Sequence, residues 1–162
     1  MLNYLLKEFK ILNNITHDEN QYLNTIKYII ENGSLINSRN GNVYTTIGCP
    51  MHFNLENNII PILTTKKVAI KTCIRELLWF IEGKTDNKIL KNQNVHIWDD
   101  NGSREFLDSR GLINRNEDDL GPIYGYQWRH FNYEYSGCDK DYSNKGIDQL
   151  KYIIKCLKDK NE

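Results

Sequence analysis

The sequence predicts a single globular domain of helices and strands, organised around one buried helix over 68–83. Three observations lead to this prediction. Apolar residues recur at helical spacing over 68–83, they alternate along 43–55, and they recur at helical spacing near both ends, over 18–30 and 147–157. A chain of 162 residues, 40% hydrophobic and 26% charged, has the size and composition of one such domain.

The composition argues against several classes of function. Lys plus Arg equal Asp plus Glu at 21 each, so no overall charge favours nucleic acid or an anionic membrane. The longest wholly apolar run, from Leu77 to Ile81, is too short to span a bilayer. The four cysteines are widely spaced and form no Cys-x-x-Cys pair, so neither zinc nor a disulfide framework is expected. We therefore expect a cytoplasmic protein without a metal.

The N-terminal part of the sequence predicts an extension followed by a helix. Residues 1–18 form an N-terminal extension or linker, and the domain itself covers 19–162. Apolar residues at helical spacing over 18–30 follow a candidate cap at Asp18, and Asn32-Gly33 is a stop signal. This helix is most simply structural.

A polar turn over 37–42 comes next, and the alternation over 43–55 predicts two short strands interrupted near Gly48 and Pro50. Arg39 lies at the tip of the turn. An arginine in such a loop is usually solvated, although the fixed fork of its guanidinium also suits a phosphate group. Arg39 is therefore a candidate phosphate-binding residue.

The helix predicted over 68–83 is apolar around most of its circumference, which is typical of a buried helix. Thr64 or Thr65 is placed to cap it. Glu76 falls in the apolar sector, and a buried carboxylate is costly unless it is paired, hydrogen-bonded or neutralised. One interpretation is a structural glutamate that reaches solvent or a basic partner. The other is a carboxylate that handles protons in a cleft.

The second half of the sequence predicts short helices joined by polar loops. We expect helices over 87–91 and 103–109, an extended segment over 95–98 and a turn over 99–102. The stretch 121–131, GPIYGYQWRHF, has glycine and proline breakers among its aromatic residues and is too interrupted for a long regular element. Its aromatic residues either belong to the core or line a pocket for a planar ligand.

Five segments, in this order and spacing, resemble the N-terminal half of thymidylate synthase: PILTTKK, ELLWFIEGKTDN, IWDDNGSREFLD, DLGPIYGYQWRHF and DQLKYIIKCLK. Together they form a specific match from about Gln21 to the C-terminal end. The lead HDENQYL is similar to the junction at which the synthase begins in fused dihydrofolate reductase-thymidylate synthase proteins.

The resemblance implies an α+β fold: a partial thymidylate synthase fold with a twisted mixed sheet, a central buried helix and several flanking helices. It implies reductive methylation of deoxyuridylate (dUMP) to thymidylate (dTMP), with 5,10-methylenetetrahydrofolate donating both the carbon and the hydride. The implied partners are dUMP, the folate and a second polypeptide. That polypeptide is an identical subunit of a homodimer or a chain that supplies the complementing C-terminal half.

The resemblance also implies catalytic roles for three residues. Glu76 corresponds to the glutamate that organises water and proton transfers around the pyrimidine and the folate ring. Tyr124 corresponds to the tyrosine that steers proton removal from the ring carbon that accepts the methyl group. Trp98 aligns with an apolar wall of the same site.

Ligand-binding roles follow in the same way. Arg39 corresponds to the arginine of a mobile loop that neutralises the nucleotide phosphate. Ile97 aligns, together with Trp98, with the apolar wall that faces the folate and its methylene group. Asn101 aligns with a polar folate contact.

The family's nucleophilic cysteine stands in a proline-cysteine-histidine motif, and no cysteine of this sequence has that context. We therefore expect a chain truncated before the catalytic cysteine, with little or no activity alone, because a thiolate must add to the pyrimidine. One alternative is a non-catalytic interaction or remnant module. The other is a deoxycytidylate hydroxymethylase, since the residue that distinguishes uracil from cytosine lies outside the matched half.

Overall fold

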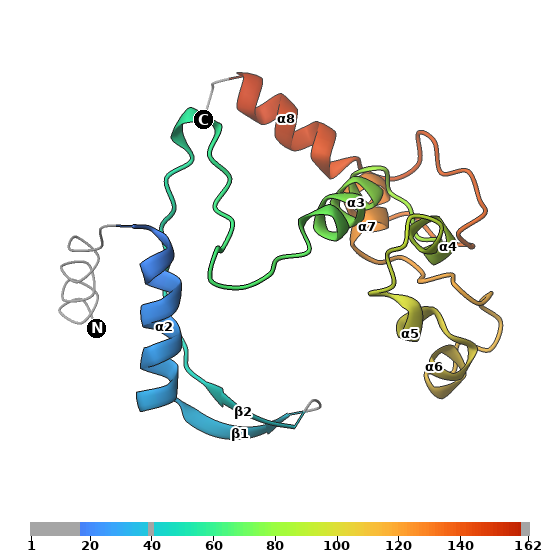
Figure 1. Ribbon diagram of the computed structural model, residues 1–162. Coiled ribbons are helices and arrows are strands. Elements are labelled where there is room, and N and C mark those ends of the chain that lie inside the picture. Colours follow the sequence, from blue (N-terminus) through green and yellow to red (C-terminus); the bar gives the residue numbers. More distant parts are fainter. Residues whose placement is uncertain (1–16, 39–40, 160–162) are drawn as a thin grey trace. The chain divides into compact units, whose positions relative to one another are not determined.

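The computed structural model describes residues 17–38 and 41–159, and it divides the chain into two compact units, Met1–Val68 and Ala69–Glu162 (Figure 1). The first unit contains α2 (Glu19–Asn32), β1 (Ser34–Ser38), β2 (Gly41–Thr45) and the 3-10 helix η1 (Glu56–Asn58). The second contains α3 (Ile70–Ile81), α4 (Asn87–Lys91), α5 (Asp99–Gly102), α6 (Arg104–Ser109), α7 (Tyr124–His130) and α8 (Gln149–Asp159). Among these helices, none is both long and apolar enough to cross a bilayer.

Helix α2 confirms the helix predicted near the N-terminus. Asp18 occupies the N-cap position, but its carboxylate accepts a hydrogen bond from the backbone N–H of Asn54 at 2.9 Å and does not cap the helix. Gly33 occupies the C-cap position, where an added Cβ would collide with the carbonyl oxygen of Ile29. The helix therefore ends where predicted, and a larger residue at position 33 would force its surroundings to shift.

Glu19 fastens the segment at Thr64 and Thr65 to the first turn of α2. Its carboxylate accepts hydrogen bonds from the backbone N–H and the hydroxyl of both threonines, at 2.7 to 2.8 Å. These bonds lower the pKa of Glu19 to about 2. The expectation that Thr64 or Thr65 caps the next helix is wrong, because Ala69 is the N-cap of α3.

Strands β1 and β2 form an antiparallel hairpin in which Ser34 pairs with Thr45 and Ser38 with Gly41. The predicted turn over 37–42 is wrong at 37–38 and 41–42, which belong to β1 and β2, and residues 39–40 lie outside the described residues. The prediction also missed β1 and placed a second strand as far as residue 55, where the structure has none. The side chains of Leu35 and Tyr44 are 57% and 56% exposed. Because the hairpin has no buried face, alternation of apolar residues is a poor guide to its limits.

The expected twisted mixed sheet is absent from the described residues, whose strands form only a two-stranded antiparallel sheet; helices predominate. Helix α3 is also less buried than predicted. Trp79 and Phe80 are buried, but the apolar stripe is 40 to 53% exposed at Ile74, Leu77, Leu78 and Ile81. The physical reason is that α3 packs on α4 and α7 within its unit, and these contacts leave the stripe uncovered.

The core of the second unit lies where α3, α4 and α7 meet. Its buried apolar side chains are Trp79, Phe80, Leu90, Val95 and Leu120, with Ile89, Trp98, Ile123 and Trp128 packed against them. A second centre surrounds the buried Tyr126, whose ring packs edge-on against Tyr135 and Tyr142 at centroid distances of 5.0 and 4.9 Å. The unit therefore depends on aromatic packing rather than on a sheet.

Two short helices of this unit, α4 and α6, begin at residues whose side chains cap them. Asp86 caps α4 by accepting a hydrogen bond from Lys88 N at 2.9 Å, and Ser103 caps α6 by accepting one from Phe106 N at 3.1 Å. Two expectations need correction. Residues 95–98 are not a strand, and the predicted turn over 99–102 is the single helical turn α5. The aromatic stretch 121–131 contains only the seven-residue helix α7, in agreement with the prediction that no long regular element forms there.

Candidate active site

The three residues predicted to be catalytic meet in the second unit. Trp98 donates a hydrogen bond from Nε1 to Oε1 of Glu76 at 2.8 Å, and Glu76 is half-buried on α3. The ring of Tyr124, the first residue of α7, lies 6.2 Å from that of Trp98, centroid to centroid. A carboxylate, an indole and a phenol from three separate segments thus form one group. We call these three residues the Glu76 group.

Phe80 packs against both aromatic members of the Glu76 group. Its ring packs edge-on against Trp98 at 6.2 Å and against Tyr124 at 5.4 Å, in both cases at an interplanar angle of 81°. This role of Phe80 was not predicted from the sequence. The signal was nevertheless present, since Phe80 follows Glu76 by four residues and such pairs share a helix face.

Glycines bring α3 and α7 close enough for this packing. An added Cβ at Gly125 would lie 2.9 Å from the carbonyl oxygen of Phe80 and 3.0 Å from its Cα. Gly83 follows α3 with a positive φ of 72°, which favours glycine. The backbone of α7 therefore rests directly against α3, and Tyr124 reaches the ring of Phe80.

Polar contacts with α4 and with the segment at Asp118 hold the segment that carries Trp98. Asn87, fully buried on α4, donates hydrogen bonds from Nδ2 to Oδ1 of Asp99 at 2.9 Å and to Oδ1 of Asp118 at 3.1 Å. Asp99 also meets Nδ1 of His96 at 2.8 Å. The hydrogen bond from Asn87, followed by that from His96, lowers the pKa of Asp99 against the opposing effect of burial.

The predicted ligand-binding residues have different positions. Ile97 precedes Trp98 and is 53% exposed, and Asn101 is half-buried on α5. Both therefore lie on the segment that presents Trp98 to Glu76. Arg39, the predicted phosphate-binding residue, lies outside the described residues, so its role stays a prediction.

The thiol of Cys138 is poorly suited to act as a nucleophile. Burial and the nearby carboxylate of Asp119 raise its pKa to about 11. Asp119 is itself buried, and its carboxylate accepts hydrogen bonds from Tyr135 Oη at 2.5 Å and from the backbone N–H of Cys138 at 3.1 Å. Cys138 is thus part of a structural network.

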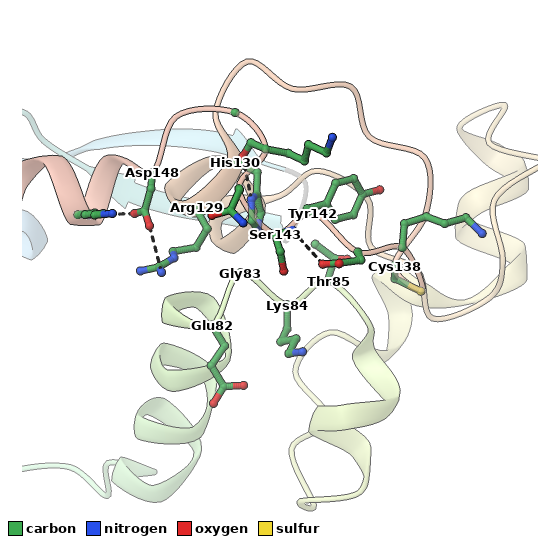
Figure 2. A pocket seen from close by; sticks show the side chains of 16 residues that line it. Glu82, Gly83, Lys84, Thr85, Arg129, His130, Cys138, Tyr142, Ser143 and Asp148 are labelled. Carbon is green, nitrogen blue, oxygen red and sulfur yellow. Dashed lines mark hydrogen bonds and ion pairs between the residues drawn. The ribbon is translucent and has the colours of Figure 1, made fainter.

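A separate polar cavity of about 610 Å³ lies beyond the C-terminal end of α3 (Figure 2). Arg129 and His130 line it: Nη2 of Arg129 is 3.1 Å from Oδ2 of Asp148, and Nδ1 of His130 is 3.2 Å from the carbonyl oxygen of Lys145. No described member of the predicted site lines this cavity. The aromatic stretch therefore contributes to two places, with Tyr124 in the Glu76 group and its C-terminal end at the cavity.

Comparison with known proteins gives a consistent result. A family model described as thymidylate synthase matches residues 20–162. The chain is 53% identical over 143 residues to a probable thymidylate synthase of Schizosaccharomyces pombe, covering 87% of this chain and 23% of that protein. It is 48% identical over 145 residues to thymidylate synthase of Agaricus bisporus, covering 88% and 49%.

A bifunctional dihydrofolate reductase-thymidylate synthase of Leishmania amazonensis is 46% identical over 154 residues, which cover 93% of this chain and 30% of that protein. The chain therefore spans half or less of the length of these curated relatives. The matched region includes the whole second unit and the Glu76 group within it.

Proposed function

The chain belongs to the thymidylate synthase family, and from this premise we propose that it supplies one wall of a site for the reductive methylation of dUMP. The observation that carries the proposal is the meeting of Glu76, Trp98 and Tyr124. A carboxylate that can exchange protons lies beside flat aromatic rings that suit planar ligands. The substrates are dUMP and 5,10-methylenetetrahydrofolate, which supplies the one-carbon group and the hydride.

Each member of the wall has a distinct task. Glu76 moves protons through water between the pyrimidine and the folate ring, and its hydrogen bond from Trp98 fixes the direction of the carboxylate. Tyr124, which is 59% exposed, places its hydroxyl where the substrate carbon loses its proton. Ile97 and Asn101 contact the folate, and Arg39 binds the phosphate of dUMP.

The nucleophile comes from outside these 162 residues. Methyl transfer to the pyrimidine requires a thiolate that adds to the ring and activates the neighbouring carbon, and acids or bases alone do not replace this covalent step. No cysteine of the sequence follows a proline, and the raised pKa of Cys138 keeps its thiol protonated near neutral pH. The chain alone is therefore inactive or nearly so.

The exposed apolar stripe of α3 supports a complementing polypeptide. Leu77 and Leu78 are 48% and 53% exposed, and on α8 Ile153 and Leu157 are 52% and 76% exposed. Exposed apolar surface of this kind on two helices is typical of an interface. We propose that a different polypeptide, which carries the remaining part of a thymidylate synthase, covers this stripe and contributes the thiolate.

Co-expression tests this function directly. The chain is produced alone and together with a polypeptide that carries the remaining part of a synthase, and conversion of dUMP to dTMP is measured, with dCMP assayed in parallel. We expect turnover only from the mixture. Glu76→Gln should lower it by about 100-fold or more. The matched control is Glu82→Gln at the exposed C-cap of α3, which should leave turnover within about twofold.

Two outcomes would overturn the proposal. Turnover of dUMP by the pure chain alone would show that the nucleophile lies within these residues. A soluble, active complex whose rate is unchanged by Glu76→Gln would remove Glu76 from the site.

A further inference from the structure

The buried amide of Asn87 bridges two carboxylates. Its Nδ2 donates to Oδ1 of Asp99 at 2.9 Å and to Oδ1 of Asp118 at 3.1 Å, and its side chain is fully buried. Nζ of Lys91 lies 2.6 Å from the same oxygen of Asp118. Carboxylates only accept hydrogen bonds, so the amide nitrogen must face them. The amide oxygen, Oδ1, is then left without a hydrogen-bond partner among the described residues.

Asn87 and Asp118 also hydrogen-bond to the two ends of α5. Asp99, its first residue, is held through its side chain by Asn87. Gly102, its last residue, accepts a hydrogen bond through its carbonyl oxygen from Asp118 N at 2.8 Å, and an added Cβ there would lie 3.2 Å from Asp118 Cα. Asn87 N in turn donates to Asp118 O at 2.9 Å. The single turn of α5 is thus fastened to α4 and to the segment at Asp118.

Trp98 is the residue immediately before α5, and its indole donates to Glu76. A four-residue helix has too few internal hydrogen bonds to fix its own orientation, so its position depends on these external contacts. We propose that Asn87 and Asp99 are positioning residues that set the indole of Trp98 against Glu76 and carry Asn101 with it. This inference rests on the proposed function and deepens it.

The electrostatics agree with this geometry. Two buried or half-buried carboxylates beside each other repel unless donors lie between them. The two N–H groups of one amide serve both, and Lys91 balances the charge at Asp118, which raises the pKa of Lys91. Asn87 Oδ1 has no hydrogen-bond partner among the described residues, so the two donor contacts from Nδ2 are the side-chain hydrogen bonds that this position makes.

The test reads the indole of Trp98 without requiring turnover. The full chain is labelled with ¹⁵N, the Nε1–H resonance of Trp98 is assigned with Trp98→Phe, and its exchange with solvent is followed. We expect Asp99→Ala and Asn87→Ala to shift this resonance and to speed its exchange about tenfold. Asp99→Asn keeps an oxygen that accepts from Asn87 and should hold exchange within about twofold of the parent.

The controls separate positioning from folding. Asp100→Ala changes the neighbouring exposed carboxylate and should leave the Trp98 resonance in place. The Nε1–H resonance of Trp128 reports whether the second unit is still folded. If Asn87→Ala unfolds the second unit, the Trp98 resonance of Asp99→Ala provides the test. The Asp99 side chain is 33% exposed, so its removal leaves a smaller cavity than removal of the fully buried Asn87 side chain. A Trp98 resonance unmoved in folded Asp99→Ala would overturn the inference, whatever the activity assay gives.

Discussion

The carboxylate of Glu76 accepts a 2.8 Å hydrogen bond from the indole of Trp98, 22 residues further along the chain. An indole N–H has no acceptor capacity, so the bond depends on an oxygen at position 76. Glu76→Gln keeps that oxygen, and we expect its near-ultraviolet circular dichroism to match the parent. Glu76→Ala removes the oxygen and should change the tryptophan signal. Equal spectra for the alanine and parent chains would contradict this prediction.

The pKa of Glu19 makes the first unit sensitive to acid. The hydrogen bonds from Thr64 and Thr65 lower it from 4.5 to about 2. Because the folded pKa lies below the unfolded one, the stabilisation is complete above about pH 4.5 and disappears as the pH falls towards 2.

The measurement is the urea midpoint as a function of pH. We expect the parent chain to lose more stability between pH 5 and pH 2.5 than Glu19→Gln, whose curve should be flatter. Glu31→Gln is the matched control, since Glu31 is an exposed residue of the same helix whose carboxylate lies 3.9 Å from Nζ of Lys27. Parallel curves for the parent and Glu19→Gln would refute the assignment.

The thiol of Cys138 should react slowly. Its pKa is raised from 9.0 to about 11, which lowers the thiolate fraction roughly 100-fold near neutral pH. Iodoacetamide at pH 8, followed by peptide mass analysis, should label the exposed Cys73 first and the half-buried Cys138 much later. Labelling of both at the same rate would show that Cys138 is not protected in this way.

Substitutions on α3 and α4 should separate exposed from buried apolar residues. Leu78 is 53% exposed, so Leu78→Lys should change the free energy of unfolding by less than about 0.5 kcal/mol and reduce aggregation in light scattering. Leu90 is fully buried, and Leu90→Ala should cost about 2–5 kcal/mol. If Leu78→Lys destabilises the chain as much as Leu90→Ala does, the stripe is covered in solution.

Gly125→Ala should weaken the contact between α7 and α3. Alanine favours a helix by about 1 kcal/mol, but its Cβ would lie 2.9 Å from the carbonyl oxygen of Phe80, and such overpacking costs about 1–3 kcal/mol. We expect a net loss of stability in thermal unfolding. Gln127→Ala, on the same helix, removes one exposed hydrogen bond to Pro122 and should have a smaller effect. A more stable Gly125→Ala chain would contradict the packing.

Much of the helical structure was predictable because its signals are local. Spacing, caps and glycine stops located α2, α3, α4, α6 and α8 to within a few residues. The limits of the hairpin were not predictable, because β1 and β2 are exposed along most of their length and so carry no burial pattern. The burial of α3 was overestimated because an apolar stripe shows what a helix can bury and does not show whether an element covers it.

The candidate site divides in the same way. Glu76 stood out as a carboxylate in an apolar sector, and resemblance to a known family added Trp98 and Tyr124. Asn87 and Gly125 escaped the sequence analysis because each acts through a contact with a distant segment. An asparagine at the start of a short helix and a glycine among aromatic residues carry no local sign of such a contact.

The sequence by itself determined the family, through the resemblance of five of its segments, and the residue types available for chemistry. It also determined most of the helices, because a helical period links positions three and four residues apart. Only the tertiary structure decided which side chains meet. The carboxylate of Glu76 accepts a hydrogen bond from Trp98, and that of Glu19 accepts hydrogen bonds from Thr64 and Thr65. Asn87 donates a hydrogen bond to Asp99. These contacts join residues 12 to 46 positions apart, where packing between elements, rather than local spacing, sets the distance.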